Sequence, residues 1–220
     1  IKDLIIMTNS LKIILLFSII IFSCKGPTKE QKEVLDTKNK LEEDLDKLLK
    51  NKFKDDISTY LNAYNKGDWD VVSNMWNPKL FEFAPRDQLV ELLIQTEEMG
   101  MKMKFSDQSI EKISEIINYE DSKFSIIYYK VRLKVEISGD MLENIEQLKQ
   151  NFIPIYGEDN LKYDETTNTF DIKVRNAMIA MSNEKMSDWK YLEYNKQQTE
   201  LMEVLLPEEV LNRVTKIKTL

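Results

Sequence analysis

"KFSIIYYKVRLKVEIS", from Lys123 to Ser138, alternates apolar and charged side chains with a period of two. The apolar positions are Tyr129, Val131, Leu133, Val135 and Ile137, and the charged positions between them are Lys130, Arg132, Lys134 and Glu136. Successive side chains of a strand point to opposite faces of the sheet, so this pattern predicts a strand with one buried and one solvated face. It excludes a helix here.

Further strands are predicted on both sides of this stretch. Two strands joined by the turn "NEKM" are predicted at residues 169–182 ("TFDIKVRNAMIAMS") and 188–195 ("DWKYLEYN"). A further strand is predicted at residues 109–118, joined by a turn to the strand that begins at Lys123. A short helix, Asp140–Phe152, is expected between the hairpins. Residues 196–220 form a C-terminal helical segment in which Pro207 stands at a helix start.

The first half of the chain is predicted to be helical. Apolar residues recur at helical spacing from Glu30 to Tyr64, which predicts a long amphipathic helix interrupted at Gly67. A second helix is expected between Pro85 and Gly100, burying Leu89, Leu92, Leu93 and Thr96. Helices followed by an antiparallel sheet predict the α+β fold class, with the N-terminal helices packed on one face of the sheet.

The net charge of −7, the pI near 5.0 and the absence of histidine exclude several functions. Nucleic acid is not expected as a partner, because phosphate binding needs a clustered basic surface and the sequence shows no such cluster. Imidazole-based catalysis and the commonest zinc ligand are absent. No phosphate loop, metal-ligand spacing or cofactor motif is present, so we expect no cofactor and no metal.

The stretch "LKIILLFSIIIFSCKGP", Leu11–Pro27, predicts how the protein is held in the cell. Its apolar run is shorter than the about 20 residues that span a bilayer, and it ends at the only cysteine, Cys24. "IFSC" resembles the lipobox of bacterial lipoproteins. The resemblance implies a signal peptide over residues 1–23, with Met7 as the true start, and acyl chains, palmitate among them, on Cys24. Residues 24–33 are expected to be a flexible tether and residues 34–50 an amphipathic helix.

The partner that this resemblance implies is the membrane, through the acyl chains on Cys24. It implies a place in the bacterial cell envelope, at the outer membrane and facing the periplasm, because Lys25 stands where inner-membrane lipoproteins carry aspartate.

A second resemblance concerns residues 51–195. The run "YLNAYNKGDWDVVSNMWNPKLFEF", a helix after proline, and long paired strands ending in "DWKYLEYN" resemble the nuclear transport factor two-like superfamily, an α+β cone with a curved sheet. This superfamily includes isomerase-like and cyclase-like enzymes as well as non-catalytic binding modules. The resemblance implies a pocket, whose expected lining is Tyr64, Trp76, Tyr129 and Trp189, although these aromatics could equally close the core.

Enzymes of this superfamily carry acids or a histidine on the concave apolar face. Here Glu136 and Asp171 alternate with the apolar positions of their strands, so their side chains are expected to point to the other face of the sheet. No acid is therefore expected on the apolar face, and no catalytic residue is assigned. The leading hypothesis is a non-catalytic, lipid-anchored binding or scaffold module for a small hydrophobic ligand, a peptide or an envelope protein. The alternatives are an isomerase- or cyclase-like enzyme, and a structural envelope protein that self-associates through the long helix.

Overall fold

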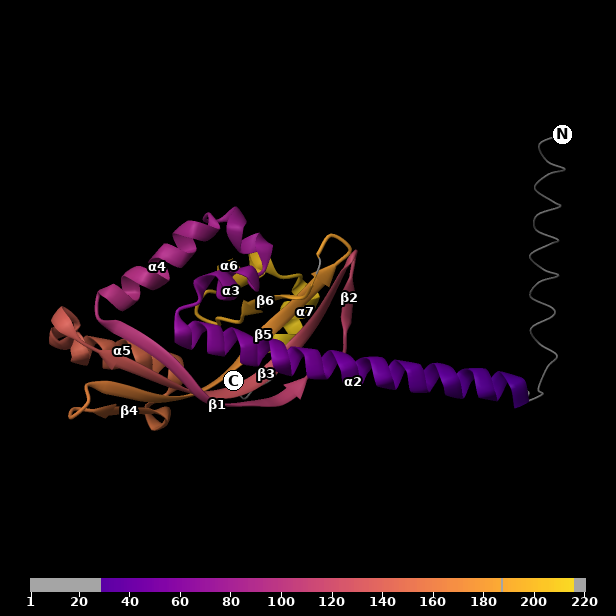
Figure 1. The fold of residues 1–220 in the computed structure, drawn as a ribbon, viewed down its shortest axis with the longest axis horizontal. Coiled ribbons are helices and arrows are strands. Elements are labelled where there is room, and N and C mark those ends of the chain that lie inside the picture. Colours follow the sequence, from indigo (N-terminus) through magenta and orange to yellow (C-terminus); the bar gives the residue numbers. More distant parts are fainter. Residues whose placement is uncertain (1–28, 187, 216–220) are drawn as a thin grey trace, which may run out of the picture. The chain divides into compact units, whose positions relative to one another are not determined.

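The computed structural model describes residues 29–186 and 188–215 (Figure 1). The expected signal peptide over residues 1–23 and the acylation site Cys24 lie outside the described residues. The chain divides into two compact units, Ile1–Leu49 and Lys50–Leu220, which are treated separately. Among the described residues, no helix is both long enough and apolar enough to cross a bilayer.

Helix α2, Lys29–Lys66, contributes to both units. It begins at Lys29, so residues 29–33, expected to belong to the tether, are helical. Lysine, glutamate and glutamine are good helix formers, and their low hydrophobicity does not prevent helix formation. In the first unit Leu41, Leu45 and Leu48 are 68%, 56% and 66% exposed, so this part of the predicted apolar stripe faces solvent.

The second unit is built on a six-stranded antiparallel sheet. The strands are β1 (Met101–Ile113), β2 (Ile117–Tyr119), β3 (Ser122–Ile137), β4 (Leu161–Asp164), β5 (Thr169–Asn183) and β6 (Lys190–Glu193). Their order is β1-β3-β5-β4, with β2 also paired to β3 and β6 also paired to β5. The α+β class with an antiparallel sheet is therefore confirmed.

Helices and short 3-10 turns surround this sheet. They are α3 (Trp69–Asn74), α4 (Arg86–Glu98), α5 (Ile145–Tyr156), α6 (Thr199–Leu205) and α7 (Glu208–Thr215), with 3-10 turns at Pro78–Glu82, Gly139–Asn144 and Glu158–Asn160. Helix α4 lies between Pro85 and Gly100 as predicted, but its expected burial is wrong. No residue of α4 is fully buried and Leu92 is 58% exposed, because only part of this helix packs on β1.

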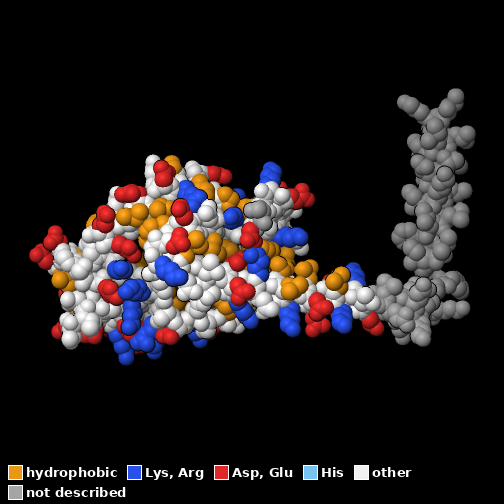
Figure 2. Space-filling model, viewed as in Figure 1, with side chains coloured by type: hydrophobic (Ala, Val, Ile, Leu, Met, Phe, Trp, Pro, Cys, Tyr) orange, Lys and Arg blue, Asp and Glu red, His pale blue; other side chains and the backbone are white. Residues whose placement is uncertain are grey.

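The alternation of Lys123–Ser138 is confirmed along β3. Val131, Leu133 and Val135 are buried, whereas Lys130 and Arg132 are exposed. The buried residues lie opposite Val174, Ile172 and Phe170 of β5 in the antiparallel register. On the solvent face, Lys and Arg side chains gather where β1 and β4 lie (Figure 2).

The part of α2 that belongs to the second unit runs across the buried face of the sheet (Figure 1). Its Phe53, Ile57 and Leu61 are buried. Near its end, the Asn65 side chain binds the backbone of Phe105 twice: its Nδ2 donates to the Phe105 carbonyl and its Oδ1 accepts from the Phe105 amide, each at 2.7 Å. This amide pairs with the edge strand β1 as a neighbouring strand would, and fixes the helix against the sheet.

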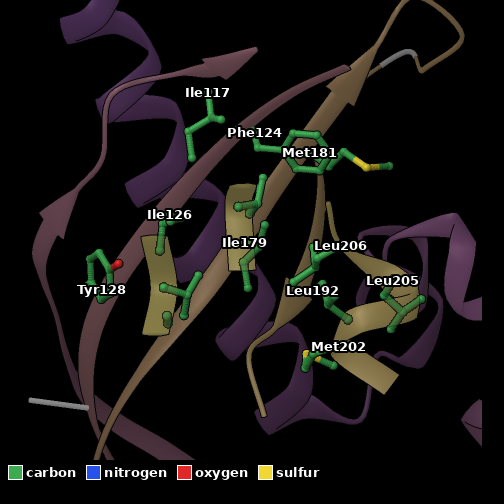
Figure 3. Packing of buried hydrophobic residues seen from close by; sticks show 13 residues of the cluster. Ile117, Phe124, Ile126, Tyr128, Ile179, Met181, Leu192, Met202, Leu205 and Leu206 are labelled. Atoms are coloured by element: carbon green, nitrogen blue, oxygen red, sulfur yellow. The ribbon is translucent and has the colours of Figure 1, made fainter. Parts of the chain in front are cut away.

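The opposite face of the sheet is also covered at one end. Residues 124–129 of β3 are buried without alternation, because α6 and α7 pack on the side that is solvated farther along the strand. Figure 3 shows this cluster, to which the sheet contributes Ile126 and Ile179 and the C-terminal segment contributes Leu205 and Leu206. Helices α6 and α7, from the segment 196–220 expected to follow the domain, thus contribute to the core of the second unit.

Candidate functional site: an aromatic cavity with a carboxylate

A cavity of about 480 Å³ lies in the second unit, on the sheet face that carries Val131 and Leu133. Its walls come from α2, the sheet and the end of α5, and also from α4, α6 and the segments that follow α3 and β6. Aromatic side chains make up much of the lining: Tyr60, Tyr64, Trp76, Phe105, Tyr129, Tyr156, Tyr191 and Tyr194. A volume of this size and a lining that combines apolar and aromatic side chains with polar groups are typical of small-molecule sites.

Three of the four expected lining residues meet in this cavity: Tyr64 from α2, Trp76 from the loop after α3, and Tyr129 from β3. The fourth, Trp189, is not part of the lining. Its ring packs edge-to-face on Phe53 of α2, with ring centroids 4.9 Å apart. Trp189 precedes the first residue of β6, so the strand alternation that directs Tyr191 into the cavity does not govern its side chain.

The aromatic walls are held by specific contacts. Tyr64 packs edge-to-face on Trp69 and on Phe105, with centroid distances of 5.0 and 5.1 Å. The Trp76 indole N–H donates to the Tyr60 hydroxyl at 3.3 Å. Offset and edge-to-face ring pairs are favourable beyond the area that they bury, so the cavity has a preformed wall.

One carboxylate lines the cavity beside these rings: that of Glu193, an exposed residue. The Tyr129 hydroxyl and the Asn176 amide both donate to Glu193 Oε1, at 3.0 and 2.8 Å. Glu193 lies opposite Met178 in the register of β6 with β5, and Tyr191, two residues earlier, lies opposite Ala180. The period of two therefore directs both Tyr191 and Glu193 to the cavity face.

The expectation that the apolar face carries no acid is wrong for this reason. It rested on the two long strands, β3 and β5, whose Glu136 and Asp171 do have the opposite parity. The acid comes instead from the short strand β6, in the segment "KYLE". The sequence contains a signal for this position. Tyr191 and Glu193 are two residues apart on one strand, so a strand that turns Tyr191 to the cavity face also turns Glu193 to it.

Burial makes the cavity tyrosines weaker acids. It raises the pKa of Tyr64 to about 12, with a smaller contribution from Glu97 and Glu193. The pKa of Tyr60 and that of Tyr129 are also raised, chiefly by burial and then by the Glu193 charge. These hydroxyls are neutral near pH 7; that of Tyr129 donates to Glu193, whereas that of Tyr60 accepts from Trp76 and can donate its own hydrogen to an acceptor in the cavity.

A polar network supports the cavity wall where β6 meets α2. The Tyr191 hydroxyl donates to Asp56, and Lys52 forms ion pairs with Asp56 at 3.1 Å and with Asp188 at 2.9 Å. Burial and the neighbouring Asp56 raise the pKa of Tyr191. The network links residues 135 positions apart, so the sequence offered no direct signal for it.

Within residues 29–186 and 188–215, no group of three His, Cys, Asp or Glu side chains is placed to hold a metal ion. The polar groups of the cavity lining are the Glu193 carboxylate, tyrosine hydroxyls, the cations of Arg175 and Lys196, and the side-chain amides of Asn176, Asn195, Gln197 and Gln198. Such a set can hold a largely apolar molecule and orient one or two of its polar groups.

No family model matches this sequence, and no curated protein matches it. Among solved structures, a Streptomyces avermitilis protein assigned as a dehydratase of the NTF2-like family is similar, with a TM-score of 0.29 and 10% sequence identity. The similarity covers 62% of this chain and 86% of that protein. The α+β class of this chain rests on its own strands and helices, as described above.

Proposed function

We propose that this protein is a ligand-binding module of the bacterial cell envelope. Acyl chains on Cys24 hold it at the outer membrane on the periplasmic side, and the cavity of the second unit takes a small hydrophobic molecule. The observation that carries the proposal is the cavity of about 480 Å³ that combines aromatic walls with the hydrogen-bonded Glu193 carboxylate.

The cavity lining suits a ligand with an apolar body and one hydrogen-bonding group. Rings such as Tyr64 and Trp76 contribute apolar area at a low entropic cost, because each side chain has few rotatable bonds. Glu193 Oε1 already accepts two hydrogen bonds, and the carboxylate retains acceptor capacity for a ligand hydroxyl. The Tyr60 hydroxyl, which accepts from Trp76, can in turn donate to a ligand oxygen.

Tryptophan fluorescence tests this proposal with a matched control inside the same chain. Dodecanol, an apolar chain with one hydroxyl, serves as the probe, and the protein is the chain from residue 24 onward carrying Cys24→Ser, which retains every described residue. Binding should change the tryptophan emission and raise the melting temperature with the logarithm of probe excess. Trp76→Phe should abolish most of the fluorescence change, whereas Trp189→Phe should preserve it. The opposite pattern would place the probe outside this cavity.

A second candidate function is an isomerase- or cyclase-like enzyme, favoured by the orientation of Glu193. A carboxylate held by Tyr129 and Asn176 in the lining of an aromatic cavity is suited to remove a proton beside a carbonyl, with the Tyr60 hydroxyl as donor to the developing oxyanion. Solvent deuterium exchange at the α-carbon of a cyclic enone, followed by NMR, tests this function. Exchange that requires the protein and is lost in Glu193→Gln would favour the enzyme over the binding module.

A further inference from the structure

A second hollow, of about 960 Å³, lies beside the aromatic cavity and differs from it in charge. Five cationic side chains line it: Lys130, Arg132, Lys173, Arg175 and Lys196. The lining holds a single carboxylate, Asp107. Residues 173–177 of β5 lie between the end of its pairing with β4, at Ile172, and the start of its pairing with β6, at Met178. This stretch of β5 bears two of the five cations.

Neighbouring acids neutralise only part of this charge. Glu111 forms ion pairs with Lys130 and with Arg175 Nε, the latter at 2.5 Å, and Asp171 pairs with Arg132. Within the described residues, the two Nη groups of Arg175 have no acceptor and Lys173 has no ion-pair partner. On β3 and β5, the four cations Lys130, Arg132, Lys173 and Arg175 lie with three acids, Glu111, Asp107 and Asp171, in a chain whose net charge is −7. The fold thus gathers positive charge that the sequence had not shown as a cluster.

The hollow and the aromatic cavity share part of their walls. Ile155 and Tyr156 at the end of α5, together with Arg175 and Lys196, line both. The cationic hollow therefore adjoins the apolar cavity at these residues. A ligand long enough to pass this boundary would meet apolar rings on one side and cations on the other.

We propose that the ligand is an amphiphile with an apolar chain and a single anionic head, either a carboxylate or a phosphate. This inference rests on the proposed function and specifies its ligand. The chain lies among Tyr64, Trp76 and Tyr129, and the head lies against Arg175 and Lys173. Glu193 would repel an anion placed beside it, so charge complementarity assigns the head to the hollow rather than to the aromatic end.

Calorimetry with four probes tests this inference on the chain from residue 24 onward carrying Cys24→Ser. The probes are dodecanoate, dodecyl phosphate, dodecanol and inorganic phosphate. A charge-assisted hydrogen bond to Arg175 should make at least one anionic amphiphile bind about tenfold more tightly than dodecanol, which corresponds to about 1.4 kcal/mol. The ratio of dodecanoate to dodecyl phosphate affinity identifies the head. Inorganic phosphate should bind far more weakly, because it lacks the chain.

Charge-removing variants locate the head. The double variant Arg175→Gln and Lys173→Gln should abolish the preference for the anion, so that this variant binds the anionic amphiphile no more tightly than it binds dodecanol. Lys123→Gln removes the same kind of charge from exposed β3 surface outside both linings, and should change neither affinity. Arg175→Lys keeps the charge and should retain most of the preference, which separates lost charge from misfolding.

The outcomes distinguish this inference from the proposed function. Equal affinity for dodecanol and both anions would overturn the amphiphile while the binding module stands. Failure of all three chain-bearing probes to bind would overturn both. If inorganic phosphate binds as tightly as the anionic amphiphiles do, the hollow is an anion site independent of the cavity. That result would also overturn the inference.

Discussion

The Tyr129 hydroxyl and the Glu193 carboxylate, 64 residues apart in the chain, meet at 3.0 Å in the aromatic cavity. This contact joins the central strand β3 to the short strand β6 across β5. Asn176, on β5 between them, donates to the same oxygen at 2.8 Å. Three strands thus converge on one acceptor atom.

Removing the Tyr129 hydroxyl should weaken this convergence measurably. Tyr129→Phe is expected to lower the free energy of unfolding by about 1–2 kcal/mol, since a hydrogen bond to a charged acceptor is lost and the ring remains. Urea unfolding measures the change. In a double-mutant cycle with Glu193→Gln, the two effects should not add, because the residues share the bond. Additive effects would show that the pair does not interact in solution.

The buried tyrosines predict a loss of stability at alkaline pH. Tyrosine in an unfolded chain has a pKa of about 10, and the folded protein raises the pKa of Tyr64 to about 12. Because the folded pKa is the higher one, the stabilisation is fully present below pH 10 and is lost as the pH rises toward 12. Tyrosinate absorbance and circular dichroism, recorded together against pH, should show cavity tyrosines ionising with unfolding. Ionisation of every tyrosine near pH 10 in a still-folded protein would contradict this.

Gly100, between α4 and β1, is expected to tolerate no side chain. Its φ is +99°, and a Cβ there would overlap the carbonyl oxygen of Ser138, whose amide donates to Gly100 O at 2.8 Å. Gly100→Ala should therefore lower the free energy of unfolding by about 1–3 kcal/mol from the backbone conformation alone, with the overlap adding to it. Gly139→Ala is the matched control: its φ is +57° but no atom lies within 4 Å, so only the conformational cost of about 1 kcal/mol applies. Equal losses in the two variants would refute the steric argument.

The anchor prediction depends on the thiol of Cys24, the only cysteine in the chain. Cys24→Ser in the native host should move the protein from the membrane fraction to the soluble fraction, or leave it as unprocessed precursor, because a hydroxyl does not replace the acylated thiol. Mass spectrometry of the membrane-bound protein should show acyl chains at this residue. An unmodified Cys24 in that fraction would exclude the anchor.

The local sequence pattern predicted the structure correctly where a single residue or the repeat of apolar positions determines it. The alternation from Tyr129 to Ile137 predicted the strand and its buried face, and Gly67 and Pro85 marked the ends of helices. The first strand was only partly found: residues 109–118 were predicted, whereas β1 begins at Met101. The alternation of Met101, Met103 and Phe105 with lysines was available there, but its apolar side chains are only partly buried and give a weaker pattern.

The site itself depended on pairings that join distant parts of the chain. Tyr64, Trp76 and Tyr129 could be named from their aromatic character, but their common cavity follows from α2 crossing the sheet and from the register of its strands. The placement of Trp189 against Phe53 rather than in that cavity likewise depends on packing between α2 and the turn before β6.

The fold class, the buried face of the long strands and the expectation of an acylated Cys24 could be inferred from the sequence, because each follows from neighbouring residues. The cavity beside Glu193, and the hollow that Lys173 and Arg175 share with Lys130 and Arg132, depend on the folded arrangement of the chain. The two-residue alternation along a strand predicts which of its side chains lie on the same face of the sheet. Which strands lie together, and which helices cover each face, depends on long-range hydrogen bonds and burial that no local period encodes.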